Sequence, residues 1–214
     1  MHPSAIKVLQ TDIVFALSAT SPNAAKAFRI MKNTIKTLEF SPGGHKLLFS
    51  VVVFGTAPSV RLKFSDRFVS REHFERVIDA IPRPTSGADL VKAIDEAARL
   101  FQLPGARPKA KKVVVVMIDN KSGINMIDIK EAVASLKAKG IAIVAVAVGN
   151  TADIQELAFV TPEINDVINS SLDELPEVLG EKVMKKAMEG KKVFLTFFYH
   201  YSIFLKKEID ISFT

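Results

Sequence analysis

Residues able to do catalytic chemistry are few in this sequence and lie far apart. The four histidines, His2, His45, His73 and His200, are scattered, and no Asp or Glu pairs them at metal-ligand spacing. The absence of Cys excludes a cysteine nucleophile, a disulfide scaffold and a cysteine-type zinc site. There is no Gly-x-Ser-x-Gly elbow, and the segment SATSPN lacks the glycines of a phosphate-binding loop. We therefore expect a chain that is not an enzyme.

The first turn-like segment, SATSPN, is also the place where two other kinds of site would lie. A receiver-like phosphoacceptor needs clustered carboxylates after its first strand, and the sequence has Ser18 and Ala19 there, which disfavours this class. The helix that is expected after Pro22 offers backbone N–H groups to an anion, as every helix start does. A phosphate site at that helix therefore stays open, with little weight.

Basic residues are the other group whose spacing could bind a ligand, in a chain of net charge +6. Some precede a buried strand in the segment RPKAKK and others end the last expected helix, and both places lie at the same edge of the domain. One interpretation is a solvated lysine-rich face. The other is a site for sulfated glycan or another polyanion, held by charge and weakened by salt. The residues concerned are Arg107, Lys109, Lys111, Lys112, Lys185 and Lys186.

The elements that must position these residues alternate between strands and helices. Apolar runs predict strands at 11–17, 47–54, 113–118 and 141–148, a short strand at 166–169, and an antiparallel edge strand at 59–64, where VRLKF alternates. Helical spacing predicts helices at 22–38, 71–80, 87–101, 127–139, 152–160 and 171–189. Gly140 would end one helix, and Ser171 with Glu174 would cap the last.

This order of elements predicts an α/β fold. We expect a doubly wound, mostly parallel six-stranded sheet with helices on both faces, of the Rossmann-like kind. Ligands of such sheets bind at the carboxyl ends of the strands, near the point where the strand order reverses. The loops after Leu17, Ile118 and Val148 are therefore where a site is expected.

Four segments in this order resemble the von Willebrand factor A domain. They are TDIVFALSATS, the helix LVKAIDEAARLF after PTSGAD, the strand and loop KKVVVVMIDNKSG, and LKAKGIAIVAVAVGN. The resemblance covers residues 11–189 and is closest to the modules of collagen VI and matrilins. It implies a metal-ion-dependent adhesion site, in which a partner's acidic side chain completes the coordination of a hard cation such as Mg²⁺.

The pattern of that adhesion site is only partly present. It requires Asp-x-Ser-x-Ser after the first strand, a Thr in a second loop and an Asp after the fourth strand. The corresponding positions here are Ser18, Thr20 and Pro22, then Pro84 or Thr85, and then Asp119.

The resemblance therefore implies a degenerate metal site. Thr20 and Asp119 keep an oxygen ligand, whereas Ser18 removes a carboxylate and Pro22 a hydroxyl. Asp12 matches a family Asp at the opposite end of the first strand, and Asp89 falls in the first turn of a helix, where an acidic residue is favoured anyway. Mg²⁺ binding is accordingly disfavoured, because a dication among hydroxyls and one carboxylate lacks compensating charge. No other cofactor is expected.

The function that the resemblance implies is that of a protein-interaction or adhesion module of extracellular-matrix type. Its partners would be other proteins, such as matrix proteins or collagens, and sulfated glycans, but neither nucleic acid nor a membrane span is expected. The location would be extracellular, as a fragment of a longer secreted protein. The alternative is an intracellular scaffold domain in a multiprotein complex, which the lack of a visible signal peptide and of Cys favours slightly.

Three segments are expected along the chain. Residues 1–10 form an extension, residues 11–190 the domain, and residues 191–214 an aromatic-rich tail that holds both tyrosines. The apolar run Val193–Leu205 in that tail is shorter than the roughly 20 residues of a membrane span. An extra edge strand or a dispensable, non-native extension is the interpretation that we prefer.

Overall fold

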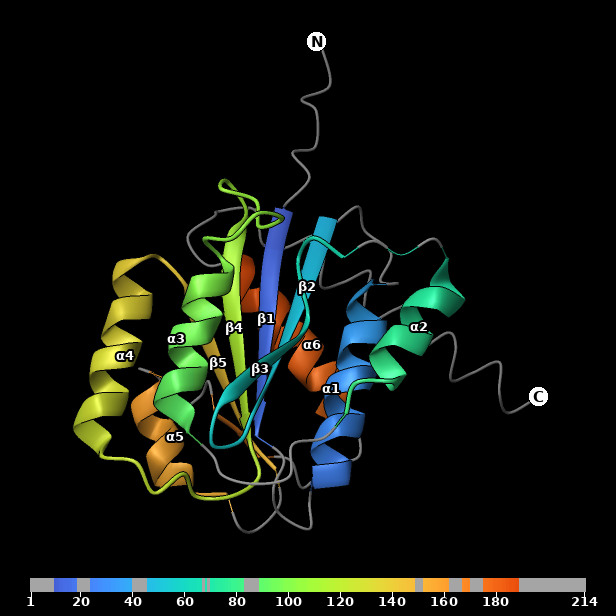
Figure 1. Ribbon diagram of the computed structural model, residues 1–214. Helices are drawn as coiled ribbons and strands as arrows, with labels where there is room; N and C mark the ends of the chain where they lie inside the picture. Colours follow the sequence, from blue (N-terminus) through green and yellow to red (C-terminus); the bar gives the residue numbers. More distant parts are fainter. Residues whose placement is uncertain are drawn as a thin grey trace.

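The computed structural model describes residues 10–18, 24–39, 46–66, 68, 70–82, 89–148, 152–161, 167–169 and 175–188. Within these residues, one mixed sheet lies between two layers of helices (Figure 1). Its strands are β1 (Gln10–Ser18), β2 (Lys46–Phe54), β3 (Pro58–Leu62), β4 (Lys111–Ile118), β5 (Ala142–Ala147) and β6 (Val167–Asn169). The helices are α1 (Ala24–Glu39), α2 (Arg71–Asp79), α3 (Leu90–Leu100), α4 (Met126–Ala138), α5 (Ile154–Val160) and α6 (Leu175–Met188).

The strand order across the sheet is β3-β2-β1-β4-β5-β6. All described neighbours run parallel except β2 and β3, which confirms the α/β class with a mixed sheet and the antiparallel edge strand. The predicted end of that edge strand at residue 64 is wrong. The chain turns after Leu62, because the backbone N–H of Lys63 donates to the Asp66 carboxylate and the N–H of Asp66 donates back to the Lys63 carbonyl.

Alternate side chains of the central strand point into two separate cores. Ile13, Phe15 and Leu17 belong to the core under α1, α2 and α6, whereas Val14 and Ala16 belong to the core under α3, α4 and α5. Helices cover both faces of β1 and β4, and the sequences of these two strands are accordingly almost continuous apolar runs. Each large side chain that is buried fully in these cores stabilises the fold by roughly 1.5–3 kcal/mol.

Helix boundaries follow local capping. The helix expected to begin at residue 87 begins at Leu90, because the Asp89 side chain accepts a hydrogen bond from the Lys92 backbone N–H and caps it. After α4, Gly140 adopts φ +68°, and the N–H groups of Gly140 and Ile141 donate to Lys137 and Leu136, a Schellman ending. The cap predicted at Ser171 and Glu174 and the tail 191–214 lie outside the described residues. The predicted extension 1–10 lies outside them too, except for Gln10, which the structure assigns to the start of β1 and not to an extension.

The described helices are too short or too polar to cross a bilayer.

Candidate functional site

The point where the strand order reverses lies between β1 and β4, the two central strands. The chain leaves β1 toward β2 on one side and later returns to β4 on the other, so the carboxyl ends of β1 and β4 lie side by side at the place where ligands of such sheets bind. Ser18 ends β1, and Asp119 directly follows β4; the register pairs Leu17 with Met117 just before them. The fold thus brings these two residues from the sequence analysis to one edge of the sheet.

Both residues are fully buried, which is unusual for polar side chains. The hydroxyl of Ser18 has no hydrogen-bond partner among the described residues. Asp119, by contrast, is engaged in an interaction of its own within the fold. Thr20, Pro22, Pro84 and Thr85, the other positions of the expected metal site, lie outside the described residues.

The loop after β4, which begins with Asp119, is held by helix α5. The Glu156 carboxylate is only 3% exposed and accepts hydrogen bonds from the backbone N–H of Ser122, at 3.0 Å, and from the Ser122 hydroxyl. That hydroxyl also accepts from the N–H of Ile124 at 3.2 Å. These hydrogen bonds anchor the loop to the buried Glu156 carboxylate of α5.

A second contact joins the same loop to the start of α5. Asp153 caps α5 by accepting hydrogen bonds from the N–H groups of Gln155 and Glu156, and it pairs with Lys121 at 3.2 Å. The hydrogen bond from the Glu156 N–H is the main cause that lowers the pKa of Asp153. Burial acts to raise this pKa, and the interaction with Lys121 adds to the lowering. The Asp153 carboxylate is thus occupied by the cap of α5 and by the ion pair with Lys121.

Asp89 could have supplied a second carboxylate to a metal, but its side chain also has partners within the fold. Its backbone N–H donates to the Gly55 carbonyl at 2.9 Å, which ties the start of α3 to the end of β2. Its side chain caps α3 and pairs with the Lys92 ammonium at 2.7 Å. Partial burial acts to raise the pKa of Asp89, but the hydrogen bonds from Lys92 outweigh it and lower the pKa.

The described residues at this edge supply only part of what a tight Mg²⁺ site needs. A hard dication needs several oxygen ligands and negative charge to offset its lost hydration. The described part of the edge offers one engaged carboxylate, Asp119, and one hydroxyl, Ser18. Nowhere in the described residues do three or more His, Asp or Glu side chains gather in a way that could hold a metal ion.

At the opposite edge of the sheet, Arg107 has a structural partner. Its guanidinium bonds to the fully buried Asp12 carboxylate through Nε at 2.7 Å and Nη2 at 2.6 Å, and Nη2 also donates to the Thr11 carbonyl. The Arg107 backbone N–H donates to the same carboxylate. Charged groups this buried are stable only when paired, so Asp12 needs Arg107.

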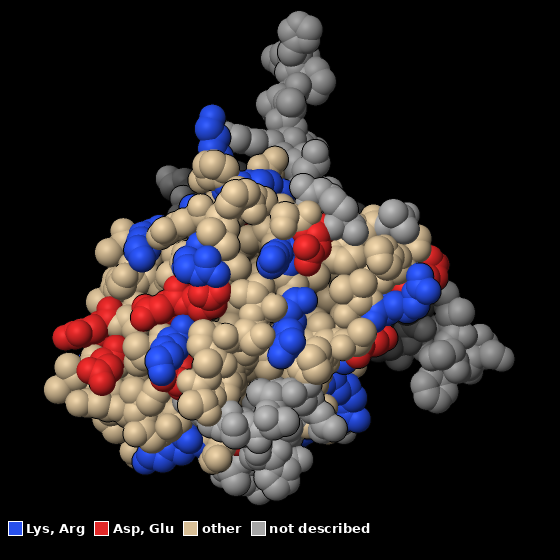
Figure 2. Space-filling model, viewed as in Figure 1, with Lys and Arg blue, Asp and Glu red and all other residues tan. Residues whose placement is uncertain are grey.

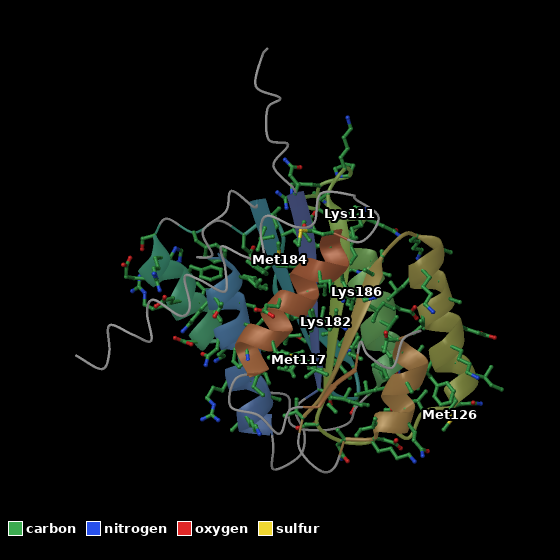
Figure 3. The ribbon with its side chains drawn as sticks, turned by 180° about the vertical axis from the view of Figure 1, so that it is seen from behind. Lys111, Met117, Met126, Lys182, Met184 and Lys186 are labelled. Carbon is green, nitrogen blue, oxygen red and sulfur yellow. The ribbon has the colours of Figure 1, made fainter. Side chains whose placement is uncertain are left out.

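The lysines expected beside Arg107 differ in their exposure. Lys109, Lys111 and Lys185 are exposed, Lys112 is half-buried, and Lys186 is buried with an interaction of its own. Figure 3 shows Lys111 near the upper end of α6, with Lys182 and Lys186 along that helix. The amino end of β4 and the last turns of α6 thus lie on the same side of the molecule.

Sequence reasoning missed Glu156 and Ser122. Glu156 stands in a short helix with no local mark that separates it from an exposed glutamate, and only the fold buries it. A partial signal was available for Asp12: a lone carboxylate within an otherwise apolar strand must find a cationic partner. The pairing with Arg107 spans most of a hundred residues, so the sequence alone could not name that partner.

Comparison with known proteins identifies what this fold resembles. Residues 12–179 match the family model of the von Willebrand factor type A domain. The chain is similar to the solved structure of proximal thread matrix protein 1 from the mussel byssus, with 20% identity and a TM-score of 0.68. That match covers 82% of this chain and 47% of the mussel protein, so the chain spans about half of that relative. A further structure of the mussel protein has a zinc-occupied MIDAS motif.

Two more structures share the fold at lower identity. The conserved hypothetical protein BatB of Bacteroides thetaiotaomicron has 13% identity and a TM-score of 0.65, over 83% of this chain and 98% of BatB. The manganese-loaded TRAP protein of Plasmodium vivax has 14% identity and a TM-score of 0.64, over 81% of this chain and 73% of TRAP. At these identities the likeness concerns the fold.

Proposed function

Because the chain belongs to the von Willebrand factor type A domain family, whose domains are protein-interaction modules, we propose that it is a non-enzymatic adhesion module of extracellular-matrix type. It is most similar to the modules of collagen VI and matrilins. Its adhesion site is degenerate, and its binding depends little or not at all on a metal. Residues 11–190 form the module, and 191–214 are a tail that it does not need.

One observation carries this proposal: Ser18 stands where the family pattern has its first carboxylate. Ser18 ends β1 and Asp119 directly follows the neighbouring β4, so a cation at this site would meet the Asp119 carboxylate and the hydroxyls at the pattern positions Ser18 and Thr20. Without a second negative charge, binding to this site does not offset the free energy that the cation loses with its hydration shell. We therefore expect the cation to stay hydrated in solution. We therefore expect the loops at this edge to contact the partner protein directly. Glu156 and Asp153 hold these loops in place.

The matrix role is supported by the nature of one relative. The mussel protein similar to this chain is a matrix protein of the byssus thread. We infer that this chain likewise contacts structural proteins outside the cell, as part of a longer secreted protein. The alternative is an intracellular scaffold built on the same domain.

The test is binding of the purified chain to immobilised type I collagen, in millimolar Mg²⁺ and in excess EDTA. We expect saturable binding with the same Kd in both buffers, and no change for Asp119→Asn. Binding that EDTA abolishes would refute metal independence. A lack of saturable binding in both buffers would refute the matrix role and favour the scaffold alternative.

A second candidate activity, binding of sulfated glycan, is favoured by the lysines at the amino end of β4 and along α6. Lys109, Lys111 and Lys185 are exposed there and available to a polyanion, whereas Arg107 is held by Asp12. We expect heparin binding that a few hundred millimolar NaCl removes, since such attraction is screened within about 10 Å at moderate salt. Lys111→Glu with Lys185→Glu should abolish it, and retention at high salt would contradict it.

A further inference from the structure

Three large apolar side chains are exposed where α4 and α5 begin, at the carboxyl edge of the sheet. Met126 and Ile127 open α4 and are 42% and 61% exposed, and Ile154 opens α5 and is 44% exposed. Among the described residues, the one other large apolar side chain exposed to this extent is Val178 on α6. The starts of α4 and α5 lie beside each other (Figure 1), and Figure 3 shows Met126 at this place. We call Met126, Ile127 and Ile154 the apolar patch.

The core does not need these side chains at the two helix starts. Ile124, which precedes the Asn125 cap of α4, is already packed against the core that holds Ile129, as in a hydrophobic staple. Ala152, which precedes the Asp153 cap of α5, is packed against the same core. The first turn of a helix favours acidic residues, not apolar ones. Exposed apolar side chains that gather at one place without adding to the core are typical of a contact surface.

The apolar patch is held by the contacts that anchor the loop between its parts. The Glu156 carboxylate of α5 accepts hydrogen bonds from Ser122, and the Lys121 ammonium pairs with Asp153 at the start of α5 at 3.2 Å. These contacts join the loop that leads into α4 to the first turn of α5. A surface positioned in this way before binding loses little conformational entropy when a partner covers it.

The charges beside the apolar patch are mainly acidic, and Figure 2 shows the acidic side chains of α4 above an uncharged surface at the start of this helix. Asp128 and Glu131 are exposed, and neither forms an ion pair within the described part of the chain. Glu131 lies one turn after Ile127 on the same side of α4. The Lys130 ammonium is directed toward α5, where it lies 4.6 Å from the centre of the Phe159 ring. The charge next to Ile127 is therefore negative.

We propose that the apolar patch binds an apolar side chain of the partner protein that stands next to a lysine or arginine, and that this cation pairs with Glu131 or Asp128. A basic neighbour matches the negative charge of this part of α4. The same charge repels the anionic headgroups of a membrane and the sulfate groups of a glycan, so a protein segment fits better than either. The inference rests on the protein-binding function proposed above, and it extends that contact surface from the loop 119–125 to the helix starts on both sides.

The first test measures the affinity of serine variants for immobilised type I collagen. Ile127→Ser and Ile154→Ser should each weaken binding about tenfold, because each removes an apolar side chain that the partner covers. The matched control is Val178→Ser, which removes a similarly exposed apolar side chain from α6, on the other face of the sheet, and should leave the affinity unchanged. All three side chains are exposed, so the melting temperatures should stay close to that of the wild type.

The second test does not depend on collagen. The isotope-labelled full chain is titrated with a short blocked peptide in which leucine stands next to lysine, and the binding is followed by amide NMR. The expected result is a set of shifts at Met126, Ile127, Glu131 and Ile154. Glu131→Gln should weaken binding of this peptide about threefold, as loss of an exposed ion pair implies. Glu72→Gln on α2 removes the same charge from an exposed glutamate elsewhere and should have no effect.

The outcomes separate this inference from the proposed function. Collagen binding that is equally tight for the wild type, Ile127→Ser and Ile154→Ser would overturn the apolar patch and leave the protein-binding function intact. Equal losses in these variants and in Val178→Ser would overturn it too. If the wild type does not bind collagen, the matrix role fails and the peptide decides: shifts at the apolar patch support the inference, and their absence refutes it. Binding to phosphatidylcholine vesicles that Ile127→Ser abolishes would replace the protein partner by a lipid surface.

Discussion

The carboxylate of Glu156 accepts hydrogen bonds from both the backbone N–H and the hydroxyl of Ser122. One buried carboxylate on α5 therefore anchors the loop that starts with Asp119. In the function proposed above this loop is part of the contact surface, which Glu156 supports without lying on it. The same arrangement makes the loop sensitive to changes in a helix that lies behind it.

Replacing Glu156 with alanine should destabilise the protein by about 3 kcal/mol, since two hydrogen bonds to a charged group are lost and the Ser122 N–H is left without its acceptor. The measurement is the free energy of unfolding in urea. Amide exchange in the loop 120–125 should speed up at the same time. Glu131→Ala, which removes an exposed glutamate of α4, serves as the control and should change stability little. Equal effects of the two variants would contradict this role.

The buried pair of Asp12 and Arg107 predicts a larger effect. Arg107→Ala leaves the fully buried Asp12 carboxylate without its cation, which typically costs about 3–5 kcal/mol. Arg107→Ala combined with Asp12→Asn should recover part of that loss, because the uncompensated charge is gone. Thermal and urea unfolding of the single and double variants measure this. A single variant as stable as the wild type would show that the pair is dispensable.

Gly105 and Gly123 offer a matched comparison of backbone strain. Both have positive φ, +105° and +69°, but a Cβ on Gly105 would lie 2.6 Å from the backbone N of Ser65, whereas one on Gly123 would meet open space. We expect Gly123→Ala to cost about 1 kcal/mol, as for other residues forced into this region. Gly105→Ala should cost clearly more, by urea unfolding. Similar costs at both positions would mean that the loop at 101–110 can move away from Ser65.

The pKa of Asp153 predicts how stability changes with acid. Because its folded pKa lies below the ordinary value of about 3.9, the carboxylate contributes stability above that value and loses it as pH falls through the folded pKa. Asp153→Asn keeps a capping side chain but has no charge to titrate. Its unfolding free energy should therefore fall less steeply than that of the wild type below about pH 4. Identical slopes would exclude Asp153 as a source of the acid sensitivity.

The parts of the fold that were predictable are those with strong local patterns. The β-branched run Val113–Ile118 predicts a strand covered on both faces, as the structure has it, and Gly140 marks the end of α4. The edge strand ends earlier than predicted because Asp66 forms a turn with Lys63. The alternation of apolar and polar residues does not decide between a longer strand and such a turn. Ser18 and Asp119 could be placed because each ends a buried strand of the sheet.

What could not be predicted depends on contacts between distant segments. The pattern RPKAKK predicts for Arg107 either a solvated cation or part of a polyanion site, whereas its partner Asp12 lies far away along the chain, in β1. The core under α1 likewise brings Ile81 together with Phe28, which lies some fifty residues earlier in the chain. Periodicity reports which side of an element is apolar, but it does not report which two elements meet.

The melting temperature of the full chain with and without millimolar Mg²⁺ or Mn²⁺ tests directly whether the adhesion site binds metal. For the wild type and for Asp119→Asn, we expect no gain of stability from either metal, because Ser18 supplies no carboxylate. The double variant Ser18→Asp, Pro22→Ser, which restores the missing family ligands, should gain stability from metal. A rise of several degrees in the wild type that Asp119→Asn abolishes would contradict the claim that this adhesion site works without metal.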